Sequence, residues 1–158
     1  MHMTEKEYSE LIKAKPELAQ KTEPKKTNKY YNKKVYVYAD GTSSEEKYTD
    51  KRYVMVFDSR KEYGRYLELK FLEFHKEITE LSRQKNLVIL DSFTYGDEKV
   101  RGISYKADFC YKDKDGNIVV EDVKPFDKKT NKYITTKDFN LKWKLLKHKY
   151  PDIKFVLI

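Results

Sequence analysis

The alternation of hydrophobic and polar residues along the chain predicts six extended segments. The segments 34–48 and 52–57 predict two strands, with a polar turn at Asp40-Gly41 inside the first segment. Four more segments are rich in β-branched and aromatic residues, at 87–93, 102–111, 118–124 and 153–158. Five turn-forming residues, 112–116, separate the segments 102–111 and 118–124, so we expect these two strands to form a hairpin.

A second pattern, with apolar residues three or four positions apart, predicts helices. Asp58-Ser59 with Glu62 has the form of a capping box, and the apolar face after it predicts a helix over residues 59–81. Residues 136–149 predict another helix, which Pro151 ends. Residues 4–20 predict a weaker amphipathic helix, and the basic stretch that follows predicts a linker.

From residue 58 onward the predicted order is helix, three strands, helix, strand. This order indicates an α/β fold in which a mixed sheet is flanked by helices. The length of 158 residues suits one such domain with an added N-terminal arm.

Three charged residues interrupt the apolar segment IVVEDVK, residues 118–124. Because side chains two positions apart share a strand face, Asp122 and Lys124 face one way and Glu121 the other. Counting back from the turn makes Asp108 a cross-strand neighbour of Asp122. Facing carboxylates repel unless a cation lies between them, and oxygen ligands without Cys or His favour Mg²⁺ or Mn²⁺. The alternative is a strand near the sheet edge, whose charges reach solvent or form a salt bridge.

The charge of the chain indicates a polyanionic partner. The formal net charge is +8, and the 14 tyrosines interleaved with Lys and Arg suit phosphate contacts and base stacking. We expect the basic segment 126–136 to be a long loop that becomes ordered when nucleic acid binds. In this segment and in the next helix, the candidates for contacts with the nucleic-acid backbone are Lys128, Lys129, Lys132, Tyr133, Lys137, Lys142, Lys144 and Lys147. The alternative for these lysines is an ordinary solvated surface.

Several classes of protein are not indicated. No apolar run is long enough to span a membrane, and no secretory signal is visible near the start. The single cysteine, Cys110, fits a reducing cytoplasm and is expected to be a small buried residue. Trp143 is expected in the core, and His75 and His148 on helices with no ligand partner. The glycines form no phosphate loop, so no small-molecule cofactor is expected.

Five motifs follow one another along the chain: NKYYNKK, FDSRKEY, YKADFCY, VVEDVK and TKDFNLKWKLL. Together they resemble the PD-(D/E)xK nuclease superfamily, and within it a family of small phage and prophage proteins. The resemblance covers residues 28–158 and leaves 1–27 as an N-terminal helix and basic linker. Ala107 stands where the name of the superfamily has Pro. The resemblance implies a restriction-endonuclease-like core with the site in the hairpin 102–124.

The resemblance also implies roles for matching residues. Asp108 and Asp122 would be metal-ligating carboxylates, with the Val123 carbonyl as a third ligand. Lys124 would position the attacking water or stabilise the charged transition state. Glu62 matches the helical acid that many such nucleases add to the metal shell, although a capping role is the alternative. Ser59 would cap the helix, contact phosphate, or both, and Glu121 would be structural.

The implied function is a Mg²⁺- or Mn²⁺-dependent DNA endonuclease of the bacterial cytoplasm, encoded by a phage or prophage. Branched DNA such as a Holliday junction is the favoured substrate, and symmetric cleavage of two strands implies a homodimer. Two alternatives stay open at this point. One is a non-catalytic DNA- or RNA-binding protein on a nuclease fold, and the other is a nicking or repair nuclease that acts on unbranched DNA.

Overall fold

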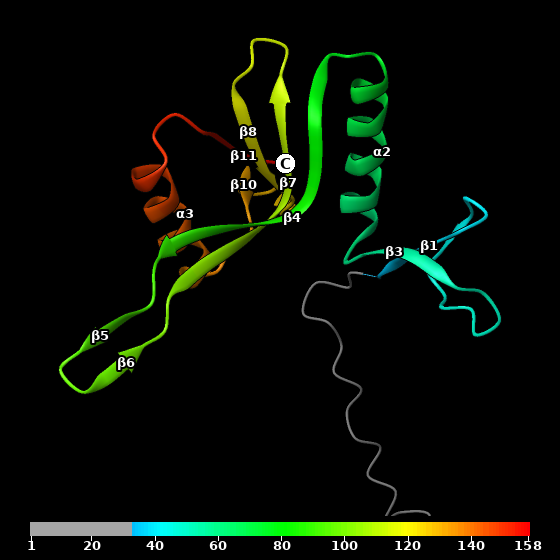
Figure 1. Ribbon diagram of the computed structural model, residues 1–158. Coiled ribbons are helices and arrows are strands. Elements are labelled where there is room, and N and C mark those ends of the chain that lie inside the picture. Colours follow the sequence, from blue (N-terminus) through cyan, green and yellow to red (C-terminus); the bar gives the residue numbers. More distant parts are fainter. Residues whose placement is uncertain (1–32) are drawn as a thin grey trace, which may run out of the picture. The chain divides into compact units, whose positions relative to one another are not determined.

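The computed structural model describes residues 33–158, which contain two helices and eleven strands (Figure 1). The predicted helix over 4–20, the linker and the boundary at 27/28 lie outside the described residues. In chain order the elements are β1 (Val35–Tyr38), β2 (Ser43–Ser44), β3 (Tyr53–Phe57), α2 (Arg60–Phe74), β4 (Ile78–Leu90), β5 (Phe93–Tyr95), β6 (Glu98–Val100), β7 (Ile103–Asp113), β8 (Ile118–Asp122), β9 (Phe126–Asp127), β10 (Lys132–Tyr133), α3 (Lys137–Lys149) and β11 (Lys154–Leu157).

The main sheet has four strands in the order β11-β8-β7-β4. The pairs β4–β7 and β7–β8 are antiparallel, whereas β8 and β11 are parallel. A parallel pair needs a crossover connection, which α3 supplies between β8 and β11. The protein is therefore a mixed α/β fold with a mixed sheet, as the order of predicted elements indicated.

The two helices cover opposite faces of this sheet (Figure 1). Neighbouring residues of β8 face opposite ways, so Val119 packs with Leu69 of α2, and Val120 packs with Trp143 of α3. Trp143 is buried in the core, as predicted, and so is Cys110. The apolar segment of β8 is buried on both faces because a helix lies over each one.

The start of α2 was predicted correctly, but its end was not. The Ser59 hydroxyl accepts a hydrogen bond from the Glu62 backbone N–H, as in a capping box. The helix ends at Phe74, not at residue 81. Lys76 takes the left-handed conformation with φ 61°, and the N–H of Glu77 bonds to the carbonyl of Leu72. This is a Schellman termination without glycine, and residues 78–81 belong to β4.

Strand β4 begins nine residues before the predicted start at Leu87 and ends at Leu90. A separate hairpin of β5 and β6, which was not predicted, extends from the end of the β4–β7 pair (Figure 1). Gly102 lies where the chain returns to β7. A Cβ atom at Gly102 would lie 2.7 Å from the Leu90 carbonyl oxygen, so a larger residue would not fit without movement of the backbone.

Face alternation along β7 breaks at Asp108. Ala107 packs in the cluster beneath α3, yet Phe109, two residues later, packs beneath α2. The partner strand is irregular at the same point, because Gln84 lies between the residues paired with Phe109 and Ala107 and has φ 53°. Asp108 therefore lies at the point where the strand changes face.

A small antiparallel sheet of order β2-β1-β3 precedes α2. Its turn contains Asp40-Gly41, as predicted, and Gly41 has φ 81°. The buried side chains of Val35, Val37 and Phe57 pack against Tyr66 of α2. This sheet therefore shares its core with the first helix.

The C-terminal elements follow the prediction with one correction. Helix α3 begins after Thr136, whose hydroxyl accepts a hydrogen bond from the N–H of Phe139. The segment 126–136, predicted to be a loop, instead contains the short hairpin of β9 and β10. In the described part of the chain, neither helix is long and apolar enough to cross a membrane.

Candidate functional site

Asp108 and Asp122 lie next to each other on neighbouring strands. Strands β7 and β8 pair Phe109 with Glu121, so one further step along both strands places Asp108 opposite Asp122. The Oδ2 atom of Asp108 also accepts a hydrogen bond of 2.7 Å from the backbone N–H of Val123. The structure therefore brings together the two acids that the sequence pattern paired.

The Asp122 carboxylate is almost fully buried and has a protein partner on each oxygen. Asp122 is 2% exposed. Its Oδ1 atom accepts a hydrogen bond from the Tyr105 hydroxyl, and its Oδ2 atom pairs with the ammonium group of Lys124. The Lys124 ammonium lies 4.5 Å from the centre of the Phe139 ring of α3. Asp122 and Lys124 thus share the α3 face of the sheet, as the period-two pattern predicted.

The environment of Asp108 disfavours its negative charge. Burial, followed by the charge of Asp122, raises the pKa of Asp108 to about 7, and the negative charge of Glu62 acts in the same direction. The Val123 N–H and the Lys124 ammonium oppose this shift without cancelling it. Asp108 therefore keeps its proton to a higher pH than a carboxyl group in water does.

Glu121 faces the other way, toward α2. Its two carboxylate oxygens accept hydrogen bonds from Arg65 at 2.8 and 2.7 Å, and the Tyr111 hydroxyl donates a third at 2.7 Å. Burial and the hydrogen bond to Glu121 raise the pKa of Tyr111, which keeps its hydroxyl protonated as a donor. This closed cluster connects β8 to α2 and leaves Glu121 no part in the Asp122 face.

Glu62 lies at the start of α2 and makes capping contacts. Its Oε2 atom accepts a hydrogen bond of 2.9 Å from the backbone N–H of Asp58, and its Oε1 atom lies 3.5 Å from Nη2 of Arg83. Ser59 has the matching capping bond to the Glu62 N–H. The structure thus accounts for Glu62 and Ser59 as capping residues, and their roles toward metal and phosphate stay predictions.

The oxygen atoms around Asp108 fit a hard divalent cation. Mg²⁺ in proteins is often held by one or two carboxylates, with water or phosphate completing its shell. Asp108 and Asp122 offer two carboxylates, and the negative charge of Asp122 is, after burial, the next cause of the raised pKa of Asp108. In residues 33–158, no three His, Cys, Asp or Glu side chains are close enough to form a metal-binding group.

The predicted nucleic-acid contacts fall into two groups. Lys128, Lys129 and Lys132 are exposed on the β9–β10 hairpin, which follows the Asp122 strand directly. Lys137 is exposed in the first turn of α3, and Lys142, one turn later, pairs with Asp138 at 3.1 Å. The hairpin that carries these three lysines therefore begins only a few residues after Asp122.

Two residues at the site were not predicted. Lys61 donates a hydrogen bond of 2.8 Å from Nζ to the Lys124 carbonyl, and the same ammonium lies 5.6 Å from the centre of the Tyr133 ring. Burial lowers the pKa of Lys61. Tyr105 contacts Asp122, although strict alternation from Phe109 would place it on the other face. Only the break at Asp108 allows this contact, and no sequence signal marks that break.

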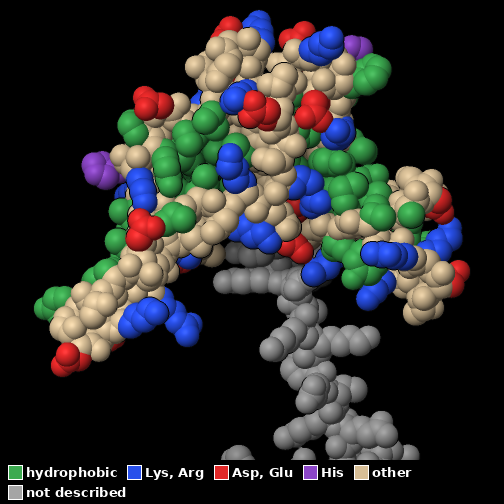
Figure 2. Space-filling model, in the orientation of Figure 1, with side chains coloured by type: hydrophobic (Ala, Val, Ile, Leu, Met, Phe, Trp, Pro, Cys, Tyr) green, Lys and Arg blue, Asp and Glu red, His purple; other side chains and the backbone are tan. Residues whose placement is uncertain are grey.

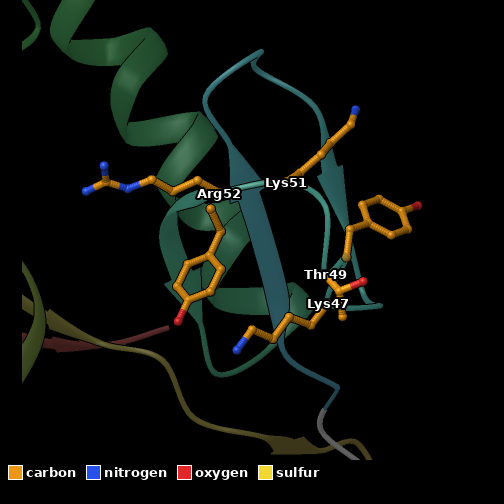
Figure 3. A pocket seen from close by; sticks show the side chains of 6 residues that line it. Lys47, Thr49, Lys51 and Arg52 are labelled. Carbon is orange, nitrogen blue, oxygen red and sulfur yellow. The ribbon is translucent and has the colours of Figure 1, made fainter.

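A second basic region lies apart from the acidic pair, in the loop between β2 and β3. It borders a hollow of about 560 Å³ lined by Lys47, Tyr48, Thr49, Lys51, Arg52 and Tyr53. Figure 3 shows that the side chains of Lys47, Lys51 and Arg52 point in different directions and do not converge on one point. Lys51 is already paired with Asp40 at 2.9 Å. This hollow therefore lacks the geometry of a single anion site.

Comparison with known proteins identifies a family without assigning an activity. No curated protein and no solved structure was found to match the chain. A family model described as "Protein of unknown function (DUF1064)" matches residues 45–158, which include α2, the main sheet and α3. Because this match spans most of the chain, the protein belongs to the DUF1064 family.

Proposed function

We propose that the protein is a metal-dependent nuclease with the restriction-endonuclease-like core of the PD-(D/E)xK superfamily. The observation that carries the proposal is the pairing of Asp108 with Asp122 on adjacent strands, with Lys124 on the Asp122 side chain. For the main sheet and its two helices, the chain order α2, β4, β7, β8, α3, β11, with β11 parallel to β8, also supports it. A role in binding alone gives no reason to place two carboxylates where phosphate would approach.

The residues of the site have distinct tasks in this proposal. Asp108, Asp122 and the Val123 carbonyl would hold Mg²⁺ or Mn²⁺, and Glu62 is a further acid on the neighbouring helix. When bound, such a cation stabilises negative charge on the phosphate oxygens and favours ionisation of a water. Lys124 orients the attacking water or stabilises charge on the phosphate, and its pairing with Asp122 holds the ammonium in place.

The proposed substrate is DNA. The net charge of +8 and the exposed lysines of the β9–β10 hairpin favour contacts with a phosphate backbone. We extend the proposal to branched DNA, such as a Holliday junction in phage recombination inside the bacterial cell, on the basis of the resemblance and the small size of the chain. Cleavage of two strands in a symmetric junction calls for a homodimer.

One experiment tests the nuclease proposal and separates the alternatives. The full chain is incubated with four-way junction, linear duplex and single-stranded DNA, each with Mg²⁺, Mn²⁺ or EDTA. The variants are Asp122→Asn and, as a matched control, Asp115→Asn in the exposed turn of the same hairpin.

We expect metal-dependent cleavage by the wild type and by Asp115→Asn. Asp122→Asn should lose cleavage while it still binds DNA. Equal cutting of all three DNAs would remove only the preference for branched substrates. Binding without cleavage under any of these conditions would leave the non-catalytic module as the better account.

A further inference from the structure

Helix α2 carries a second stripe of residues on the side away from the sheet. Gly64, Leu67, Phe71 and Phe74 follow one another at spacings of three, four and three residues, the pattern of a helix–helix seam. The exposed fractions are 49% for Leu67, 63% for Phe71 and 83% for Phe74. Figure 2 shows hydrophobic side chains gathered over the region of α2. Phe71 and Phe74 contact the ring of His75, with centroids 4.3 and 5.3 Å apart, and still have these exposed fractions.

Gly64 is a costly residue for the middle of a helix, by about 1 kcal/mol relative to alanine. A Cβ atom at Gly64 would meet nothing within 4 Å, so packing within residues 33–158 does not require glycine. Beside it lies a hollow of about 380 Å³, lined by Val35, Ser43, Ser44, Glu45, Arg60, Tyr63 and Gly64. One end of the stripe is therefore recessed, and the other end presents two exposed phenylalanines.

We propose that this stripe is the interface between two copies of the chain, with their α2 helices antiparallel. A two-fold axis through the middle of α2 would place Phe71 and Phe74 of each copy over the Gly64 end of the other. The recess of each copy would then receive the protruding rings of the other. A two-fold interface uses the same surface on both copies, so that surface has to be complementary to itself. Glycine at position 64 allows the partner helix to approach closely.

The charges along the helix agree with an antiparallel pair. The first turn of α2 carries Arg60, which is exposed and pairs with Glu45, and it also contains Glu62. The last turn has no basic residue and contains Glu73, which pairs with Lys70 of the preceding turn. The C-terminal end of a helix also carries the negative end of its dipole. An antiparallel arrangement brings the positive dipole end of each α2 helix near the negative dipole end of the other.

This interface supplies the dimer that the proposed function calls for, but it can be tested without any cleavage assay. The mass of the full chain in solution is measured by light scattering or sedimentation at tens of micromolar. We expect a mass of twice 19.0 kDa for the wild type. The double variant Phe71→Glu/Phe74→Glu should have the mass of one chain and unchanged circular dichroism. Leu141→Glu, at a residue 60% exposed on α3, is the matched control and should remain a dimer.

A second variant tests the recess directly. Gly64→Leu introduces a side chain into open space of its own chain, so the fold should be retained. In the dimer the same side chain would occupy the space of the partner, and we expect the dissociation constant to rise at least about tenfold. A wild-type monomer, a dimeric double variant, or an unchanged dissociation constant for Gly64→Leu would each overturn the proposal.

Discussion

The hydroxyl group of Tyr105 donates a hydrogen bond to the buried carboxylate of Asp122. The two residues are brought together by the change of face at Asp108 on β7. The ring of Tyr105 packs edge-on against Phe139 and Trp143, which keeps the hydroxyl aimed at the acid. Tyr105 is therefore a positioning residue for Asp122.

Replacement of Tyr105 by phenylalanine should impair the site more than the fold. The loss of one hydrogen bond to a buried carboxylate should lower the free energy of unfolding by about 1–2 kcal/mol. The concentration of Mg²⁺ needed for half-maximal cleavage should rise about tenfold, because a group that orients a metal ligand is lost. Tyr95→Phe, at a residue 75% exposed, should change neither quantity. An unchanged Mg²⁺ requirement in Tyr105→Phe would contradict the positioning role.

The stability of the metal-free protein should depend on pH through Asp108. Its pKa of about 7 in the fold lies above its value in the unfolded chain, about 3.9. The folded state therefore binds the extra proton between these values, and its stability falls as the pH rises toward and through 7. Asp108→Asn carries no charge at any pH, while its amide oxygen can still accept the bond from Val123.

Thermal unfolding in EDTA at pH 5 and pH 8 checks this prediction. Asp108→Asn should be more stable than the wild type at pH 8, by on the order of 2 kcal/mol, and this advantage should shrink at pH 5. If the gain in stability of Asp108→Asn over the wild type is the same at both pH values, or larger at pH 5, the pKa of Asp108 is not raised in the folded protein.

Mg²⁺ should stabilise the folded protein by binding at the acidic pair. A ligand that binds only the folded state raises its stability, by about 2.7 kcal/mol at one hundred times the dissociation constant. We expect a higher melting temperature with Mg²⁺ than with EDTA for the wild type and for Asp115→Asn. Asp122→Asn should show no such gain. If Asp122→Asn gains as much as the wild type, the ion binds somewhere else.

Glu121 should contribute to stability and not to the Mg²⁺ site. Removal of one partner from a buried ion pair leaves the other charge unpaired, which costs about 3–5 kcal/mol. Arg65→Ala should therefore lower the free energy of unfolding by this order in chemical denaturation. Glu121→Gln should also destabilise the protein, yet the folded variant should keep the Mg²⁺ gain in melting temperature. Loss of that gain in Glu121→Gln would place Glu121 in the metal site.

The termination of α2 predicts a stabilising substitution. Lys76 has φ 61°, a conformation that costs a non-glycine residue roughly 1 kcal/mol. Lys76→Gly should raise the melting temperature by about 2–4 °C, whereas Lys70→Gly within the helix should lower it. Differential scanning calorimetry measures both changes, and a destabilised Lys76→Gly would count against the Schellman termination.

Much of the site followed from the sequence because the β7–β8 hairpin is regular near its turn. Gly116 takes φ 83° there, and the N–H of Gly116 bonds to the carbonyl of Asp113, so the turn sets the register. Counting outward from the turn then brings Asp108 to Asp122. The contact from Tyr105 could not be predicted in this way, because it depends on the change of face opposite Gln84. Gln84 takes the left-handed conformation, and no glycine marks that position in the sequence.

The end of α2 was missed for a related reason. Phe74, Ile78 and Leu81 follow one another at spacings of four and three residues, which continues a helix-like pattern across the true end of the helix. Lys76 occupies the left-handed position where glycine is usual. The β9–β10 hairpin was missed because its strands have two residues each, too few for an alternation to be seen.

Asp122 lies at the centre of the metal-dependent nuclease that we propose. The most direct measurement is the initial rate of cleavage of a labelled four-way junction at saturating protein with Mg²⁺, for the wild type and Asp122→Asn. We expect cleavage by the wild type that EDTA abolishes, and a rate at least about 100-fold lower for the variant with DNA binding retained. No cleavage by the wild type with Mg²⁺ or Mn²⁺, or equal rates for the two proteins, would contradict this proposal.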